Sequence, residues 1–369
     1  MRILRLVNHG DHKSVFVDDR EYSFQDESRG VREKFWLTRE KTNLYYEPMS
    51  LREILFKYNR TKASYEDYGE IISSRVAKQI GLDCVDYYLA GMYEDDSEDL
   101  RHGVICGSYK KNNDEKEFSV ENLQFVMSTP DIDTQTGEYK NINTVDGICD
   151  ALETFKQYGV TDEQIYKIRI ELLKQVIFDF LLAQTDRHCR NTSILMSKDT
   201  GGRCFIRKAP CYDNGCISFL KLKLAKIIGR VQMIEAKGIE PPYIEQMMAS
   251  YIPLTGVKTQ TIDVHPCKNW EGLMRVDAKQ DAETKEQFLN ELAREILTIP
   301  ELAVFYIQLK ERLNMAEVFN RIEMEGDKVD PYVQKLVTYV VDYQLNDLEK
   351  AVQRNKVLLK EVGDVWKLE

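Results

Sequence analysis

The chain has 369 residues, which is long enough for two packed lobes. Its formal net charge of −10 lacks the basic excess of an autonomous nucleic-acid-binding protein, so we expect no direct contact with DNA or RNA. No segment approaches the roughly 20 apolar residues that span a bilayer, and the apolar run at the amino terminus is too short for a signal peptide. These features predict a soluble, cytoplasmic protein.

The first 112 residues predict a small β-rich lobe that carries a single helix. A helix is expected from about Tyr65 to Ile80, where apolar residues recur at helical spacing before the stop signal Gly81. The expected strands are Ser14–Val17, Lys34–Leu37, Ile54–Tyr58 and Asp86–Ala90. The polar stretch Lys110–Glu117 that follows is predicted to be an exposed connection.

Lys57 and Glu70 are the candidate pair for binding nucleotide phosphates in this lobe. Lys57 follows the apolar run Ile54–Phe56, as expected for a side chain that points from a strand into a cleft, and Glu70 lies in the next helix. A strand lysine paired with a helix glutamate holds the α and β phosphates of ATP in kinases.

A loop that covers the phosphates is harder to assign. The sequence contains no G-x-G-x-x-G before Lys57 and no Walker P-loop. The best candidate is the segment Ser28–Lys34, in which Gly30, Lys34 and several backbone amides could surround a phosphate. A solvated turn is the alternative interpretation.

The region around residue 186 carries residues that phosphoryl transfer requires. Asp186 is followed five positions later by Asn191, and Asp213 comes after two short expected strands. The first carboxylate could take the proton of an attacking hydroxyl, while Asn191 and Asp213 could hold magnesium against the phosphates. His188 is a further candidate catalytic residue, with an orienting role favoured over proton transfer. An aspartate five residues before an asparagine is expected by chance in a chain of this length, so the elements around the pair decide whether it is a catalytic motif.

The context supports a catalytic loop. A long amphipathic helix is predicted over Glu163–Gln184, directly before the motif. The runs Ser193–Met196 and Arg203–Arg207 flank a Gly-Gly turn and predict a hairpin, which would return Asp213 to the vicinity of Asn191. In the alternative interpretation, these polar residues only cap and close turns.

The rest of the chain is predicted to be mainly helical. Strong helical segments are expected at Asp162–Gln184, Ala282–Thr298, Ala303–Arg321 and Pro331–Leu359. We therefore predict an α+β, bilobal protein-kinase-like fold. Residues 1–112 would form an N-lobe that anchors the nucleotide phosphates, and residues 113–369 a helical C-lobe with the catalytic and metal-binding loops.

The eight cysteines show no Cys-x-x-Cys pair and no paired histidines at zinc spacing. Four of them fall between Cys189 and Cys216, where a metal cluster is the alternative interpretation. Because they straddle two expected strands, we predict free, mostly buried thiols in a reducing compartment.

Two segments of the predicted helical lobe resemble one known family. Thr185–Asn191 resembles the T-D-x-H-x-x-N loop of the HipA-like serine/threonine kinases, which are relatives of the phosphoinositide-kinase-like group. Pro210–Asp213 is similar to the P-x-Y-D of the same family.

The amino-terminal lobe carries looser matches to this family. Gly30–Lys34 resembles its glycine-led phosphate loop, and the segments around Lys57 and Glu70 resemble its lysine and helix-glutamate segments. Gly103–Ser108, which includes Cys106, is similar to the strand that enters the adenine-binding hinge.

The resemblance implies ATP- and Mg²⁺-dependent transfer of phosphate to a serine or threonine of a protein substrate. It makes Asp186 the base, Asn191 and Asp213 the magnesium ligands, and Lys57 the phosphate anchor with Glu70 as its partner. Toxin members of the family suggest an antitoxin-like protein as a partner. The acceptor itself is not identified by the sequence.

Two other functions remain open. A kinase for a lipid or small molecule is one, because Asp186–His188 also resembles the phosphoinositide-kinase loop and the basic segment Lys221–Lys226 could attract an anionic head group. A solvated helix face is the more common explanation for such a run. A non-catalytic kinase-like nucleotide-binding module is the other, although the intact Asp186, Asn191 and Asp213 argue against it.

Overall fold

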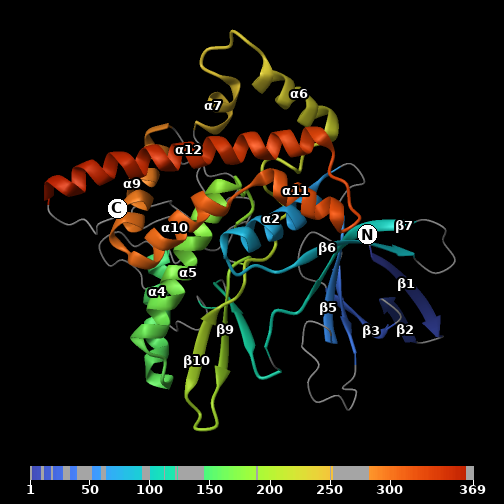
Figure 1. Cartoon of the computed structure of the whole chain (residues 1–369). Helices are drawn as coiled ribbons and strands as arrows, with labels where there is room; N and C mark the ends of the chain where they lie inside the picture. The colour runs from blue at the N-terminus through green and yellow to red at the C-terminus, as the bar shows by residue number, and fades with distance from the viewer. Residues whose placement is uncertain are drawn as a thin grey trace, which may run out of the picture.

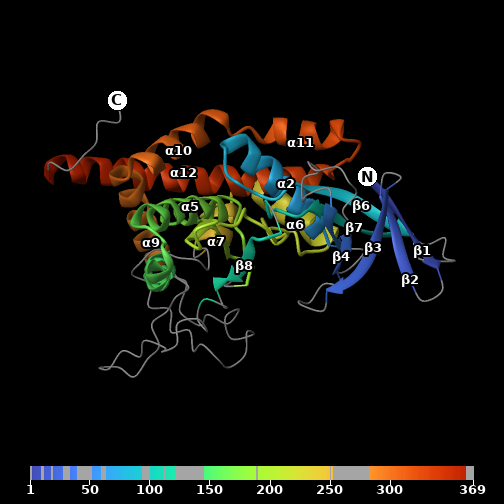
Figure 2. The ribbon, with the colours of Figure 1, turned by 90° about the horizontal axis from the view of Figure 1, so that it is seen from below.

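The computed structural model divides into a β-rich part and a helical part, with helix α2 (Glu66–Ile80) between them (Figures 1 and 2). The structure describes residues 2–9, 12–17, 20–27, 34–39, 52–59, 64–93, 100–111, 113–120, 123, 145–187, 190–249, 251 and 282–362. The β-rich part comes first in the chain and the helical part follows it, as predicted from the sequence. Whether the two parts fold as separate domains stays a prediction.

Seven strands of the β-rich part close into a barrel in the order β1, β2, β3, β4, β5, β7, β6. Neighbouring strands are antiparallel except β1 and β6, which are parallel. The strands are β1 (Arg2–His9), β2 (His12–Val17), β3 (Arg20–Glu27), β4 (Lys34–Thr38), β5 (Glu53–Tyr58), β6 (Tyr87–Tyr93) and β7 (Leu100–Gly107). Strands β1 and β3 were not predicted from the sequence, because charged residues interrupt their apolar alternation.

The alternation of side chains along β5 separates two cores. Phe56 is fully buried inside the barrel, where it stacks on Phe35 of β4 with ring centroids 5.2 Å apart. Leu55 packs on the opposite side, against the core that α2 shares with the helical part. Since neighbouring residues of a strand face opposite ways, Lys57 also leaves the barrel on the α2 side.

The helical part packs around helix α5 (Asp162–Leu181). It also carries a three-stranded sheet in the order β10, β9, β8. Its strands are β8 (Lys116–Ser119), β9 (Ser193–Lys198) and β10 (Cys204–Lys208), and β9 and β10 form the predicted hairpin. Its helices are α4 (Val145–Glu153), the 3₁₀ helix η1 (Thr154–Tyr158), α5 (Asp162–Leu181), α6 (Leu224–Glu235), α7 (Tyr243–Met248), α9 (Ala282–Thr298), α10 (Pro300–Arg312), α11 (Met315–Met324) and α12 (Pro331–Val362).

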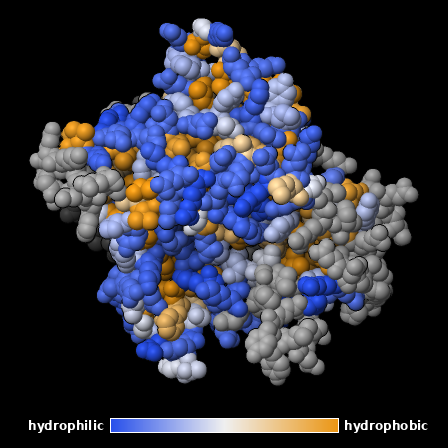
Figure 3. All heavy atoms as spheres, in the orientation of Figure 1, coloured by the Kyte–Doolittle hydropathy of each residue, from blue (hydrophilic) through white to orange (hydrophobic). Residues whose placement is uncertain are grey.

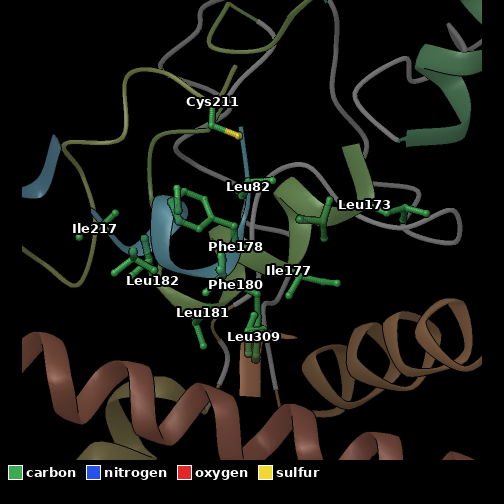
Figure 4. Packing of buried hydrophobic residues seen from close by; sticks show 14 of the residues in the cluster. Leu82, Leu173, Ile177, Phe178, Phe180, Leu181, Leu182, Cys211, Ile217 and Leu309 are labelled. Carbon is green, nitrogen blue, oxygen red and sulfur yellow. The ribbon is translucent and has the colours of Figure 1, made fainter. Parts of the chain in front are cut away.

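Helix α5 forms because its sequence carries a start signal and a broad apolar surface. The Thr161 hydroxyl accepts from the backbone N–H of Gln164, and the Gln164 side chain accepts from the backbone N–H of Thr161, which makes a capping box. The buried apolar residues of α5, among them Ile177 and Phe178, lie in the large core. This core also contains Leu82 and, from α10, Leu309 (Figure 4). The helix ends just before the segment that carries Asp186.

One helix prediction was wrong. The segment expected as a single helix over Ala303–Arg321 is broken between α10 and α11, where Leu313 and Asn314 have extended backbone. The Asn314 side chain accepts from the backbone N–H of Glu317 at 3.2 Å, so it starts a new helix. Asparagine favours this capping position over a helix interior, which explains the break.

The polar stretch Lys110–Glu117 is mostly exposed over its described residues, as predicted, and Glu115 is the exception. Glu115 is buried and receives two hydrogen bonds from Arg207 of β10, at 2.9 and 2.8 Å. Burial opposes ionisation, but the Arg207 hydrogen bonds and the Lys111 backbone N–H lower the pKa of Glu115 overall. An ion pair between buried Glu115 and partly buried Arg207 therefore holds the connection against the helical part.

The visible face of the described helical part is mostly hydrophilic, with hydrophobic residues in separate patches (Figure 3). None of the helices in the described ranges is both long and apolar enough to cross a bilayer. The six cysteines in these ranges are free thiols: Cys84, Cys106, Cys149, Cys204, Cys211 and Cys216.

Candidate active site

The ammonium group of Lys57 joins strand β5 to the next helix, α2, and to a segment 156 residues further along the chain. Its Nζ lies 2.7 Å from Glu70 Oε1 on α2 and also bonds to Oδ1 of Asp213, in the segment after β10. Lys57 and Glu70 are buried, whereas the Asp213 side chain is about one third exposed. The structure thus brings together the predicted lysine, its helix partner and one predicted metal ligand.

Strand register places two more predicted residues beside Lys57. Lys34 of β4 stands directly opposite Lys57, and Val104 of β7 is its partner on the other side. Directly opposed residues share a face, so half-buried Lys34 lies on the α2 side too. Cys106, two positions after Val104, shares that face, and burial together with the charge of Glu70 raises the pKa of its thiol to about 12.

Helix α2 and the Asp213 loop meet backbone to backbone. The second carboxylate oxygen of Glu70 accepts from the backbone N–H of Asn214 at 2.6 Å. A Cβ added to Gly69 would lie 2.2 Å from the carbonyl oxygen of Gly215, closer than any real Cβ contact. Glycine at position 69 is therefore required for Glu70 to reach both Lys57 and the loop.

Asp213 adopts a backbone conformation that is uncommon for a residue with a side chain. Its φ is +55°, in the left-handed region. Its backbone N–H donates to the hydroxyl of Tyr87 at 3.4 Å, and its carbonyl accepts from the Gln184 side chain at 3.4 Å. Non-glycine residues held this way concentrate at functional sites, because the surrounding structure must enforce the conformation.

Asp186 and Asn191 are joined through the backbone. The Asn191 side-chain nitrogen donates to the carbonyl of Asp186 at 2.9 Å, and the backbone N–H of Asp186 donates to the Gln184 side chain at 3.1 Å. Because its nitrogen is used in this way, the Asn191 amide has its oxygen as the atom that can coordinate a metal. That oxygen and the Asp213 carboxylate are oxygen donors of the hard type that Mg²⁺ prefers.

Arg187 connects these segments, a structural role that was not predicted from the sequence. It is completely buried, and its Nε and one terminal nitrogen each donate to Asp179 of α5 at 2.9 Å. Its other terminal nitrogen donates to the carbonyls of Asn191 at 2.9 Å and Tyr212 at 2.8 Å. Burial alone would lower the pKa of Arg187, but the charge and hydrogen bonds of Asp179 outweigh it and raise the pKa.

Asp179 was also missed, although the sequence contained a signal. It stands between Phe178 and Phe180 in the buried surface of α5, and all three side chains are almost fully buried. A carboxylate at such a position needs a charged partner. The pattern shows that a partner must exist, but it does not show that the partner is Arg187.

The basic segment after the Asp213 loop is not a helix face over its whole length. Helix α6 begins only at Leu224, so Lys221 lies in a turn before it. Its Nζ is 3.4 Å from Oδ2 of Asp186. The first lysine of the run therefore faces the predicted base.

The predicted site residues thus differ in how closely the structure brings them together. The structure gathers Lys57, Glu70 and Asp213 directly, joins Asp186 to Asn191, and places Lys34 and Cys106 beside Lys57. Gly30 and His188 lie outside the described residues. The chemical roles assigned to all of them stay predictions.

Comparison with known proteins identifies the family. The sequence profile of the HipA-like C-terminal domain matches residues 27–250, which is more than half of the chain. The chain belongs to this family. The resemblance found in the sequence is therefore confirmed, and the matched range includes both Lys57 and Asp213 of this HipA-like protein. A search of curated protein sequences finds no match.

Comparison with one solved structure shows the fold. The HipA-like chain resembles the crystal structure of the Helicobacter pylori proinflammatory kinase CtkA, with a TM-score of 0.53 and 14% identity over 95% of this chain and 93% of that one. HipA of Shewanella oneidensis, solved with HipB and operator DNA, is 11% identical with a TM-score of 0.41, over 94% of this chain and 71% of that one. The predicted α+β, bilobal kinase-like fold is confirmed.

A methyl group at position 69 should push α2 away from the Asp213 loop. We expect Gly69→Ala to destabilise the protein by about 1–3 kcal/mol, measured by urea denaturation, because the new Cβ collides with the Gly215 backbone. Gly229→Ala is the control, since this glycine of α6 has open space around it and alanine there should stabilise by about 0.5–1 kcal/mol. Equal midpoints for Gly69→Ala and wild type would contradict the close packing.

Removal of Arg187 should leave the Asp179 carboxylate buried without its partner. We expect Arg187→Met to lower the free energy of unfolding by about 3–5 kcal/mol. The double variant Arg187→Met with Asp179→Leu should recover part of this loss, because no buried charge remains. As a control, Arg203→Met removes only an exposed pair with Asp199 and should stay near wild type. A small effect of Arg187→Met, similar to the control, would contradict the buried network.

Proposed function

We propose that this protein is an ATP- and magnesium-dependent phosphotransferase, namely a protein serine/threonine kinase. The observation that carries the proposal is the contact of Lys57 with both Glu70 and Asp213. A buried ammonium held by a helix glutamate, beside a metal-binding carboxylate, is the arrangement with which kinases bind the phosphates of ATP. Family membership supports the kinase class and the protein acceptor.

Each residue has a role that follows from its position. Lys57 would bind the α and β phosphates, and Glu70 keeps it pointed toward them. Asn191 and Asp213 would hold Mg²⁺, which neutralises charge on the phosphates when bound. Asp186 would accept the proton of the acceptor hydroxyl while the acceptor oxygen bonds to the γ-phosphorus and the bond from that phosphorus to the ADP oxygen breaks.

Two alternative functions are less well supported. For a lipid or small-molecule kinase, the basic segment Lys221–Lys226 would attract an anionic head group, but Lys221 pairs with Asp186. A non-catalytic module would need the lysine–glutamate pair to bind nucleotide, but it would not need a carboxylate at position 186 to act as a base. An antitoxin-like partner stays a prediction.

The base is tested by one conservative substitution. In an assay with labelled ATP, Mg²⁺ and dephosphorylated casein, the wild-type protein should transfer phosphate, and Asp186→Asn should lower kcat by roughly 10²–10⁴-fold. Mg-ATP should raise the melting temperature of both proteins, since this residue does not bind the nucleotide. Nucleotide binding without transfer by wild type would favour the non-catalytic module, and neither binding nor transfer would reject both kinase functions.

The metal role of Asp213 is separated from nucleotide anchoring by a comparison of two variants. We expect Asp213→Asn to raise the magnesium concentration for half-maximal rate by about tenfold or more, because one anionic ligand is lost. Glu70→Gln should instead mainly raise the KM for ATP and change the magnesium requirement less than Asp213→Asn does, because Glu70 contacts Lys57 directly and reaches the Asp213 loop only through the Asn214 backbone N–H. The same magnesium dependence in Asp213→Asn and wild type would contradict the metal role.

A further inference from the structure

Lys221 is the charged side chain that faces the predicted base. Its Nζ lies 3.4 Å from Asp186 Oδ2, and both side chains are about one third exposed. The Cys216 thiol donates to the same oxygen at 3.4 Å. The other carboxylate oxygen, Oδ1, has no hydrogen-bond partner in the part of the chain that the structure describes.

The turn that carries Lys221 is held rigidly on both sides. Ser218 donates through its backbone N–H and its hydroxyl to the carbonyl of Leu182, at the end of α5. The carbonyl of Leu220 accepts from the backbone N–H of Tyr65, at the start of α2. Ile217 and Leu220 are fully buried, so the position of Lys221 is set by the core rather than by chance contact of a long side chain.

Two other basic side chains near the site, Lys57 and Arg187, are already bonded to other carboxylates. Lys57 is bonded to Glu70 and Asp213, and Arg187 is bonded to Asp179. Within the described ranges, Asp186 forms a salt bridge with Lys221 and with no other basic residue. Burial would lower the pKa of Lys221, but Cys216 and Asp186 raise it overall, so the ammonium is charged at neutral pH.

We propose that Lys221 is a positioning residue for Asp186: it holds Oδ2, so that Oδ1 is directed at the acceptor hydroxyl. The proposal rests on the proposed kinase function. A base must be in hydrogen-bond reach of the proton it takes, and a carboxylate that rotates freely spends little time in that geometry. A fixed cation on one oxygen restricts this rotation.

Steady-state kinetics test the positioning role. We expect Lys221→Met to lower kcat by about 10–100-fold while the KM for ATP changes less than about threefold, because the nucleotide anchors stay intact. Lys221→Arg should recover most of the loss, since guanidinium can make the same contact. Lys237→Met is the control, an exposed lysine in the turn after α6 that should keep wild-type kcat. Wild-type kcat in Lys221→Met, or no recovery in Lys221→Arg, would overturn the proposal.

A double-mutant cycle tests the contact independently of activity. Melting temperatures are compared for wild type, Lys221→Met, Asp186→Asn and the double variant. If the ion pair exists, the shifts of the two single variants do not add in the double variant; additive shifts would overturn the proposal even if no acceptor is phosphorylated. Failure of the proposed function itself would show separately, as absence of both phosphate transfer and a Mg-ATP-dependent rise in melting temperature of the wild type.

Discussion

A buried lysine between two carboxylates is the interaction on which the rest of the structure depends. An ammonium group that leaves water must regain the lost interactions from fixed partners, and Lys57 finds them in Glu70 and Asp213. Those partners come from a helix of the β-rich part and a loop of the helical part. If one part moved against the other, Lys57 would lose a carboxylate partner while still buried, or would become exposed to water. The contacts of Lys57 with Glu70 and Asp213 therefore also favour one relative position of the two parts.

Helix α2 is held from the opposite side as well. Arg75 of α2 donates to Glu325, just after α11, at 3.1 and 2.6 Å, and the Gln79 side chain contacts Asn314 and Glu317 at the start of that helix. The carboxy-terminal helices thus support the helix that carries Glu70. This explains how helices without a recognisable motif can matter to the site: they set where α2 lies, and α2 sets where Glu70 points.

Much of the site could be predicted because its signals are local. Lys57 ends an apolar strand run, and Asp186 and Asn191 follow a long amphipathic helix, which are features within reach of sequence periodicity. The roles of three other residues were not predicted: the ion pair of Asp179 with Arg187, and the contact of Lys221 with Asp186. Each role depends on a partner that the sequence does not indicate. The break at Asn314 was missed for a different reason: a capping side chain and an apolar helical stripe conflict locally, and sequence periodicity alone favoured the stripe.

The sequence by itself determined that a β-rich part precedes a helical part, and it supplied the candidate base and metal ligands and the family resemblance that the profile match confirmed. These properties depend on residues close together in the chain, where side-chain spacing and turn chemistry act directly. Only the tertiary structure decided that Lys57 contacts two carboxylates, that Gly69 lies against Gly215, and that Lys221 faces Asp186. Such contacts join segments that packing of the core brings together, and the spacing of residues along one chain carries no measure of that distance.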